Sequence, residues 1–136
     1  MQLVPVPTTK EYVDAYEHHW MPLLPMISKR SKEPVAELAA QIRSLRTQVL
    51  LAFDDDNKAV ALAGVQYKPR GNDMIGELIW CTGHKRTDWQ HLVAEIERYL
   101  KDMNCVECRP ICRLGWSRQL KQRGYKITHL VMEKRL

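Results

Sequence analysis

The sequence has no long apolar run and no recognisable targeting segment. No stretch approaches the ~18 consecutive apolar residues that a membrane-spanning helix needs. The first residues, MQLVPVPTTKEY, lack a basic region followed by an apolar one, so they do not resemble a signal peptide. Repeats, linkers and low-complexity tracts are also missing from the pattern. These absences predict one soluble domain over residues 1–136, with a cytoplasmic location.

Several motifs that identify a chemistry are lacking as well. There is no Walker loop, no Ser-His-Asp spacing, no zinc-finger pattern and no clear pair of carboxylates. Cys105 and Cys108 form a C-x-x-C pair, but no second pair matches it. In an extended strand, Cys108 and Cys112 would share one face and Cys105 the other, which would scatter metal ligands. We therefore interpret the four cysteines as buried free thiols, with a metal site as the alternative.

Positive charge is concentrated in the C-terminal part of the chain. Residues 106–136 carry eight basic and two acidic side chains, a net charge of +6, whereas the whole chain has +5. Such asymmetry suits a phosphate-bearing partner, either nucleic acid or a nucleotide cofactor. A solvated basic helix face accounts for the same charges, and the sequence leaves both interpretations open.

The first third of the chain predicts one short strand and two helices. Gln2–Pro7 is extended, and its prolines restrict it to a sheet edge or a strand end. The first helix, capped by one of two threonines, is ended or kinked by Pro22 and Pro25. After a polar break at residues 28–33, residues 34–48 have the apolar spacing of a second helix.

The remainder changes to strand-like and then mixed patterns. Residues 49–53, 59–67 and 74–82 predict three consecutive antiparallel strands separated by polar turns. A helix follows over residues 87–104, capped by Thr87 or Asp88. Its apolar stripe consists of Trp89, Leu92, Val93, Ile96, Tyr99 and Leu100.

The last part of the chain predicts a strand, a helix and a final strand. The segment CVECRPIC (105–112) is the fifth strand, and a basic helix after it ends at Gly124. The segment YKITHLVMEKRL (125–136) is the sixth strand. The resulting order, β-α-α-β-β-β-α-β-α-β, predicts an α/β (α+β) fold with a mixed, mostly antiparallel sheet.

This order of elements resembles the GNAT (GCN5-related N-acetyltransferase) fold. The late motif of that family ends a helix with an aliphatic-aromatic-charged run and Gly-Phe or Gly-Tyr, and then continues into a strand. RQLKQRGYKITHLVMEKRL has this form, with Gly124-Tyr125 at the Gly-Phe position. With Gly115-Trp116 and Gly124-Tyr125, this chain also resembles small members of the family that bacteriophages encode. A phage origin would imply the host cytoplasm or a virion as the location.

The resemblance implies a site for acetyl-CoA between the fourth and fifth strands. The family's Q/R-x-x-G-x-G/A loop would fall on residues 84–89, where Thr87 and Trp89 replace its two glycines. The opening of the following helix, with Lys85 and Arg86 beside it, still attracts an anion. The full set of implied cofactor-binding residues is Cys81, Gly83, Lys85, Arg86, Thr87, Trp89 and Trp116.

The same resemblance implies a general base near the fourth strand. Glu77 is the best placed candidate and His84 the next, each able to deprotonate an ammonium directly or through water. A structural ion pair is the alternative role for Glu77. The tyrosine that many members use to protonate the leaving thiolate corresponds to Leu120, which has no proton to give.

Three functions are compatible with these patterns. The first is acetyl transfer from acetyl-CoA to an unidentified amine. The second is a catalytically inactive GNAT-fold protein that binds a protein partner, as a virion component or an interaction module. The third is nucleic-acid binding by the basic segment, which lacks a recognised base-reading motif and ranks last.

Overall fold

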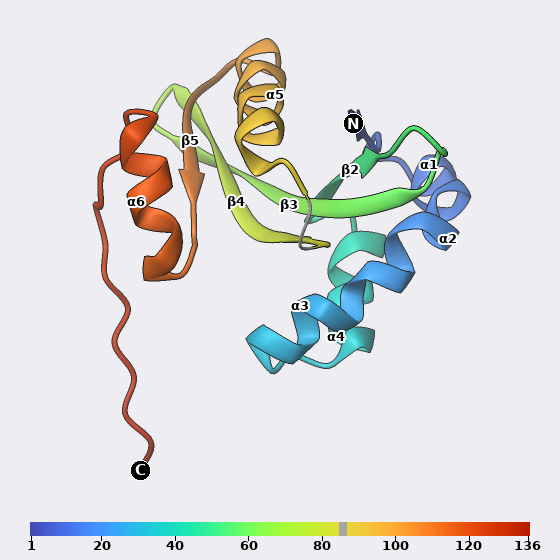
Figure 1. The fold of residues 1–136 in the computed structure, drawn as a ribbon, viewed down its shortest axis with the longest axis horizontal. Coiled ribbons are helices and arrows are strands. Elements are labelled where there is room, and N and C mark those ends of the chain that lie inside the picture. The colour runs from blue at the N-terminus through green and yellow to red at the C-terminus, as the bar shows by residue number, and fades with distance from the viewer. Residues whose placement is uncertain (85–86) are drawn as a thin grey trace.

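A five-stranded sheet forms the centre of the computed structural model, which describes residues 1–84 and 87–136. The strands lie side by side in chain order (Figure 1): β1 (Gln2–Pro5), β2 (Gln48–Phe53), β3 (Ala59–Arg70), β4 (Asp73–Gly83) and β5 (Cys105–Pro110). All neighbouring strands are antiparallel except β4 and β5, which are parallel. The predicted α/β fold with a mixed, mostly antiparallel sheet is confirmed, as are its three consecutive antiparallel strands.

Helices cover both faces of this sheet (Figure 1). One face carries α1 (Lys10–Ala15), α2 (Glu17–Trp20), the 3-10 helix η1 (Met21–Leu23), α3 (Leu24–Ser31) and α4 (Val35–Arg43). The other face carries α5 (Trp89–Asp102), and α6 (Leu114–Gln122) follows β5. No helix in the described residues has the length and apolar character to cross a bilayer.

The predicted polar break at residues 28–33 is wrong over its first four residues. Residues 28–31 continue α3, since Pro25 lies in the first turn of that helix, where a missing N–H costs nothing. The helix ends instead at Lys32, whose φ of 63° is left-handed. The single predicted first helix is accordingly a series of short helices that turns along the sheet.

Strand alternation divides the core between the two faces. Leu51 and Leu62 pack with the α1–α4 helices, whereas Leu50 and Ala63 pack beneath α5. Asp88 is the N-cap of α5, and its carboxylate accepts the N–H of His91 at 3.1 Å. Its apolar stripe then faces the sheet, as the sequence predicts. The stripe buries Leu92, Val93, Ile96 and Leu100.

Two irregularities interrupt the alternation on the strands that border the site. Between Leu78 and Trp80 the register of β4 against β3 shifts, so Ile79 is an extra residue that moves Trp80 to the α1–α4 face. A similar shift makes Val106 extra on β5. Cys105 therefore packs on the same side as Cys108, and the prediction that the two lie on opposite faces is wrong.

The fifth strand is shorter than predicted. It ends at Pro110, because the chain turns away after Ile111 donates its N–H to the carbonyl of Leu78 at 2.8 Å. Cys112 consequently lies outside the strand and is exposed, contrary to the expectation of a buried thiol.

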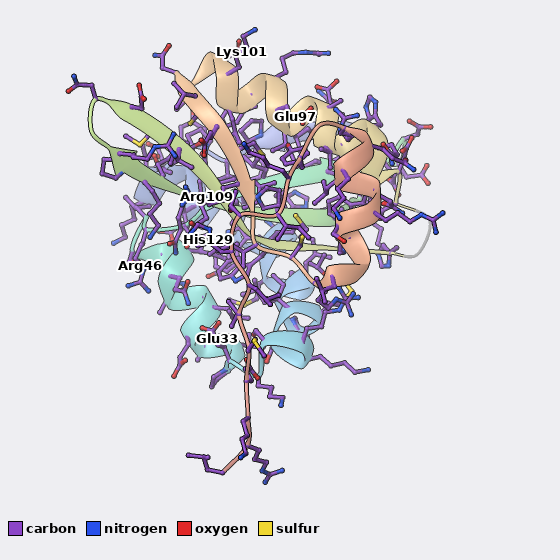
Figure 2. All side chains as sticks on the ribbon, turned by 90° about the vertical axis from the view of Figure 1, so that its left-hand side faces the viewer. Glu33, Arg46, Glu97, Lys101, Arg109 and His129 are labelled. Carbon is purple, nitrogen blue, oxygen red and sulfur yellow. The ribbon has the colours of Figure 1, made fainter. Side chains whose placement is uncertain are left out.

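The predicted sixth strand is not part of the sheet. Residues 125–136, which we call the tail, leave α6 and run as an extended chain past the body of the molecule (Figures 1 and 2). Among the described residues the tail pairs with no strand. The sequence pattern of a strand is present, but the neighbour that would satisfy its backbone is not.

Candidate functional site

The most distinctive feature near the predicted site is a separation between β4 and β5. Their pairing ends where Leu78 meets Pro110, and β4 continues alone to Gly83. The space between them, which we call the strand cleft, has a volume of about 230 Å³. Ile27 and Arg30 of α3 line it, and so do Trp89 and Val93 of α5. Because α3 and α5 lie on opposite faces of the sheet, the cleft is lined from both.

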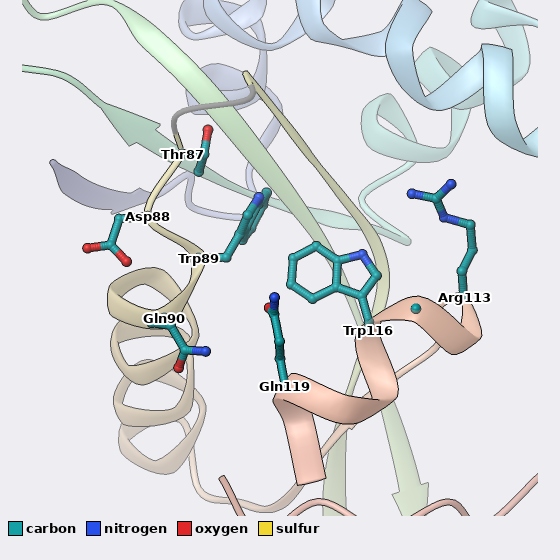
Figure 3. A pocket seen from close by; sticks show the side chains of 8 residues that line it. Thr87, Asp88, Trp89, Gln90, Arg113, Trp116 and Gln119 are labelled. Atoms are coloured by element: carbon teal, nitrogen blue, oxygen red, sulfur yellow. The ribbon is translucent and has the colours of Figure 1, made fainter. Parts of the chain in front are cut away.

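A second space lies between the first turns of α5 and α6 (Figure 3). This helix pocket measures about 730 Å³ and shares Trp89, Arg113 and Trp116 with the strand cleft. Trp89 and Trp116 meet edge to face, with ring centroids 5.5 Å apart and planes at 85°. The two rings thus occupy the junction between the two spaces, and Trp80 also lines the strand cleft.

The loop that opens α5 has mixed suitability for an anion. The Thr87 hydroxyl is buried and finds no hydrogen-bond partner in the described part of the chain, so it is available to a ligand. Against this, the carboxylate of Asp88 stands at the helix N-terminus and already takes the N–H of His91. A negative charge there opposes the helix dipole's attraction for a second anion. Lys85 and Arg86 lie outside the described residues.

Gly83 has a packing role at the end of β4. A Cβ at this position would come within 2.8 Å of the Thr87 hydroxyl oxygen and 2.9 Å of the Ala61 Cβ. Only glycine therefore allows the end of β4 to approach both Thr87 and Ala61 this closely. The role of Gly83 is therefore to permit close packing at the end of β4.

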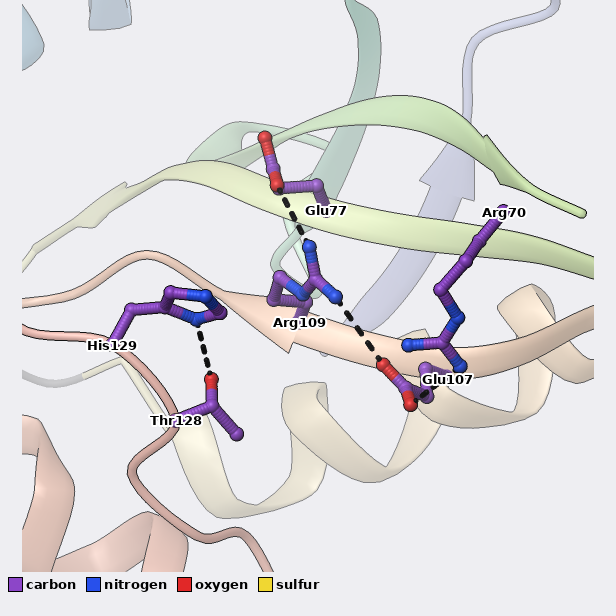
Figure 4. Close-up of polar contacts among 6 residues, drawn as sticks. All are labelled: Arg70, Glu77, Glu107, Arg109, Thr128 and His129. Carbon is purple, nitrogen blue, oxygen red and sulfur yellow. Dashed lines mark hydrogen bonds and ion pairs between the residues drawn. The ribbon is translucent and has the colours of Figure 1, made fainter.

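Glu77 lies on β4, and its carboxylate is engaged by a cation (Figure 4). Arg109 on β5 places one guanidinium nitrogen 3.9 Å from Glu77 and another 3.7 Å from Glu107. Glu107 in turn pairs with Arg70 at 2.9 Å. The Glu77 side chain is 15% exposed, so the pair is partly shielded from water. Glu77 therefore has the structural ion pair that the sequence gives as its alternative role.

The second candidate base is remote from the first. His84 follows β4 and is exposed, with its N–H bonded to the carbonyl of Val60 at 3.2 Å. His84 is seven positions from Glu77 along the chain, or roughly 23 Å at 3.3 Å per residue. The structure does not bring Glu77 and His84 together, so they cannot act on the same atom.

The cysteines and Tyr125 near the cleft are held in their neutral forms. Burial raises the pKa of Cys81, which lines the cleft, to about 12, and that of Cys108 to about 11. Burial, with hydrogen bonds to Cys108 and Glu97, also raises the pKa of Tyr125 well above its usual range. No group of three metal-binding side chains occurs in the described residues. The chain offers protonated thiols here, not thiolate nucleophiles.

The acid position of the resemblance is filled by packing. Leu120 is the one side chain of α6 that is buried, and it lines the strand cleft. Cys81, Trp89 and Trp116 line the same cleft, so these three predicted cofactor residues are brought together. Sequence reasoning missed Arg30 and Ile111, which also line it. Nothing in the local sequence of α3 indicates that Arg30 lines a cleft. Ile111 could have been found, because it is the residue directly after the end of β5.

Comparison of the structure with solved proteins identifies the fold. An acetyltransferase from Trypanosoma brucei is similar with a TM-score of 0.68 and 11% identity, over 99% of each chain. A ribosomal-protein-alanine N-acetyltransferase from Brucella melitensis gives 0.70 and 12%, over 100% of this chain and 99% of that one. An aminoglycoside N-acetyltransferase in complex with CoA gives 0.67 and 16%, over 99% and 93%.

At these identities the likeness establishes the fold alone: the chain has the GNAT fold, and the similarity covers 99–100% of its length. No family model matches the sequence, and no curated protein matches it. The chain is therefore a divergent example of a fold whose solved examples named here are acetyltransferases.

Proposed function

We propose that this protein binds acetyl-CoA in the strand cleft and helix pocket and transfers the acetyl group to an amine. The observation that carries the proposal is the strand cleft itself. It is lined from both faces of the sheet, so a donor and an acceptor can approach β4 from opposite sides. The similar aminoglycoside N-acetyltransferase was solved in complex with CoA, which supports the same class of ligand.

The two ends of acetyl-CoA fit this site to different extents. Beyond Leu78, β4 has no strand partner on its β5 side in the described residues, so its backbone can bond an extended, amide-containing chain. The phosphates would lie at the start of α5, where the Thr87 hydroxyl has no hydrogen-bond partner among the described residues. Asp88 opposes them by its charge, and the Trp89 ring lies between the helix pocket and the strand cleft.

The chain's own residues would orient the reactants and handle one proton. Acetyl-CoA supplies a thioester carbonyl carbon for attack by the amine nitrogen. The β4 backbone beside the extra residue Ile79 would orient and polarise that carbonyl. Glu77 would accept the ammonium proton, which requires its carboxylate to turn from Arg109. Leu120 excludes water but gives no proton to the departing sulfur.

A second candidate function is that of a catalytically inactive GNAT-fold protein that binds a protein partner. Three observations favour it: the ion pair of the Glu77 carboxylate with Arg109, the apolar Leu120 at the acid position, and the contact of Trp89 with Trp116 between the two spaces. For an enzyme we propose the cytoplasm as its location, and for the inactive form the cytoplasm or a virion.

Calorimetric titration with acetyl-CoA tests the proposal directly. Ile111→Trp should weaken binding, because an indole at this exposed position would occupy the strand cleft. Met103→Trp is the matched control, since Met103 is also exposed but lies at the other end of α5. Titration with 3′,5′-ADP and with pantetheine separately reports which part of the site binds.

The outcomes separate the two functions. Binding that Ile111→Trp weakens, together with a mass increase of an amine substrate after incubation, supports acetyl transfer. Binding without transfer to a panel of peptide, polyamine and amino-sugar amines supports the inactive form. Absence of binding at millimolar acetyl-CoA would reject the proposal.

A further inference from the structure

The tail presents an apolar surface that the described residues leave uncovered. Ile127 is 54% exposed, Val131 81% and Met132 84%, and Leu130 and Leu136 are also exposed. The last backbone hydrogen bond at its root runs from the Tyr125 N–H to the Leu120 carbonyl at 3.1 Å. Beyond that bond, no backbone hydrogen bond to the tail occurs in the described part of the chain. An extended apolar segment of this kind marks an interaction site.

The sequence of the tail is that of a strand with two usable faces. Successive side chains of a strand point to opposite faces, so Ile127 and Val131 share one face while Leu130 and Met132 share the other. The twelve residues would extend about 40 Å at 3.3 Å per residue. A single strand is not stable in water, so the tail requires a neighbour on at least one side.

Among the residues that the structure describes, the outer edge of β5 has no strand partner. The strand order places β5 at one end of the sheet, and within the described residues it pairs only with β4. Its Val106 is 56% exposed. Both the tail and the β5 edge thus carry free backbone groups suited to strand pairing.

The tail is held near β5 without pairing to it. Its root is fixed to α5, because Tyr125 donates to Glu97 at 2.7 Å and Arg123 pairs with the same carboxylate at 2.5 Å. From there the tail runs in the same direction as β5 (Figures 1 and 2). Figure 4 shows His129 of the tail near Arg109 of β5. No sheet pairing joins the two segments in the described residues.

We propose that two copies of this chain form a dimer in which each inserts its tail between β5 and the tail of the other. A two-fold axis perpendicular to the strands reverses the direction of the partner's tail. That tail is then antiparallel both to β5 and to the resident tail. The arrangement reads β5, partner tail, tail, partner β5, and it satisfies both free edges with one symmetry operation.

The tail is complementary to itself in this arrangement. An antiparallel register centred on His129 places Ile127 opposite Val131 of the partner subunit, and the reverse pair follows by symmetry. On the other face, Thr128 stands opposite Leu130 of the partner subunit. The two symmetry-related pairs of Ile127 with Val131 would bury side chains that are exposed in the single chain. For this reason we infer that the occupant is a second copy.

Light scattering after size exclusion tests the dimer with the full chain. The wild type should show twice the monomer mass at tens of micromolar. Leu130→Pro should raise the dissociation constant at least ~100-fold, because proline removes an N–H from strand pairing on both tails. Leu130→Val is the matched control and should remain dimeric. Since Leu130 is exposed, all three should share one urea midpoint when diluted to monomer.

A cysteine cross-link tests the register. In a Cys112→Ser background, the pair Ile127→Cys and Val131→Cys should give a covalent dimer on oxidation, because opposed residues lie about 4.5–5.5 Å apart. The pair Ile127→Cys and Met132→Cys, on opposite faces, should not. A covalent dimer from the second pair, or from neither, would overturn the tail-to-tail pairing.

Three further results would overturn the proposal. A monomeric wild type with slowly exchanging tail amides would show that the tail pairs with β5 of its own chain. A monomeric wild type with fast exchange would show that the tail has no partner in a second copy. A dimer that persists in Leu130→Pro would place the interface elsewhere.

Discussion

Replacing Asp88 by Asn should move the stability of the fold and the affinity for acetyl-CoA in opposite directions. The Asp88 carboxylate accepts the His91 N–H at 3.1 Å. The amide oxygen of Asn can accept the same hydrogen bond, so the helix cap is kept. The lost charge–dipole interaction at the helix N-terminus should lower the free energy of unfolding by about 0.3–1 kcal/mol. Thermal or urea denaturation measures this change.

The affinity should rise because a carboxylate leaves the lip of the helix pocket. Two phosphate charges bound about 7 Å away in water would each be repelled by about 0.6 kcal/mol, which amounts to about seven-fold in the dissociation constant. The gain should shrink as salt rises, since Asp88 is exposed. Calorimetric titration at low and high salt checks both expectations.

Asp102→Asn is the control for net charge. It removes the same charge from the opposite end of α5, about 21 Å away for a helix of this length. There an acid opposes the helix dipole, so this variant should gain stability and leave the affinity unchanged. Equal affinities for wild type and Asp88→Asn, or equal gains in both variants, would refute phosphate binding at the start of α5.

Three other predictions concern the body of the protein. Leu92→Asp should abolish folding, because the residue is 1% exposed against Ala52 and Ala61 and a carboxylate there would be buried unpaired. Gly76→Ala should cost about 1–3 kcal/mol, since its Cβ would lie 2.7 Å from a Leu100 methyl carbon. Stability should fall as pH rises from 9 to 12, because the Cys81 thiol has its pKa raised from 9.0 to about 12.

These outcomes are measured by circular dichroism and urea titration. His91→Asp is the control for Leu92→Asp and should fold normally, because His91 is exposed. A soluble Leu92→Asp variant with native melting would contradict the packing of α5 on the sheet. Gly115→Ala meets no atom within 4 Å and should not destabilise. Above pH 9 the unfolded thiol loses its proton first, so Cys81 adds a slope of about 1.4 kcal/mol per pH unit. Cys81→Ala should remove that slope, and an unchanged slope rejects a neutral buried thiol.

The repeating patterns of the sequence were sufficient for most of the fold. Alternation of apolar residues located β2, β3 and β4, and the helical stripe from Trp89 to Leu100 located α5 and the face it buries. The Asp88 cap was among the two predicted. These features depend on residues a few positions apart, so one chain segment contains the information for each.

The candidate site was predictable only in part. Cys81, Trp89 and Trp116 converge on the strand cleft as the resemblance implied, but Glu77 and His84 are separated. The ion pair from Arg109 to Glu77 joins β5 to β4, and Arg30 enters from α3. Contacts between segments this distant in the chain leave no periodic signal in either segment.

The sequence by itself determined the positions of β2, β3, β4 and α5, the mixed sheet and the basic C-terminal part. The tertiary structure decided the rest. The extra residues Ile79 and Val106 move side chains between faces, because each bulge depends on the register with a neighbouring strand. It also decided that residues 125–136 stay outside the sheet, since a strand forms only where an adjacent edge accepts its backbone hydrogen bonds.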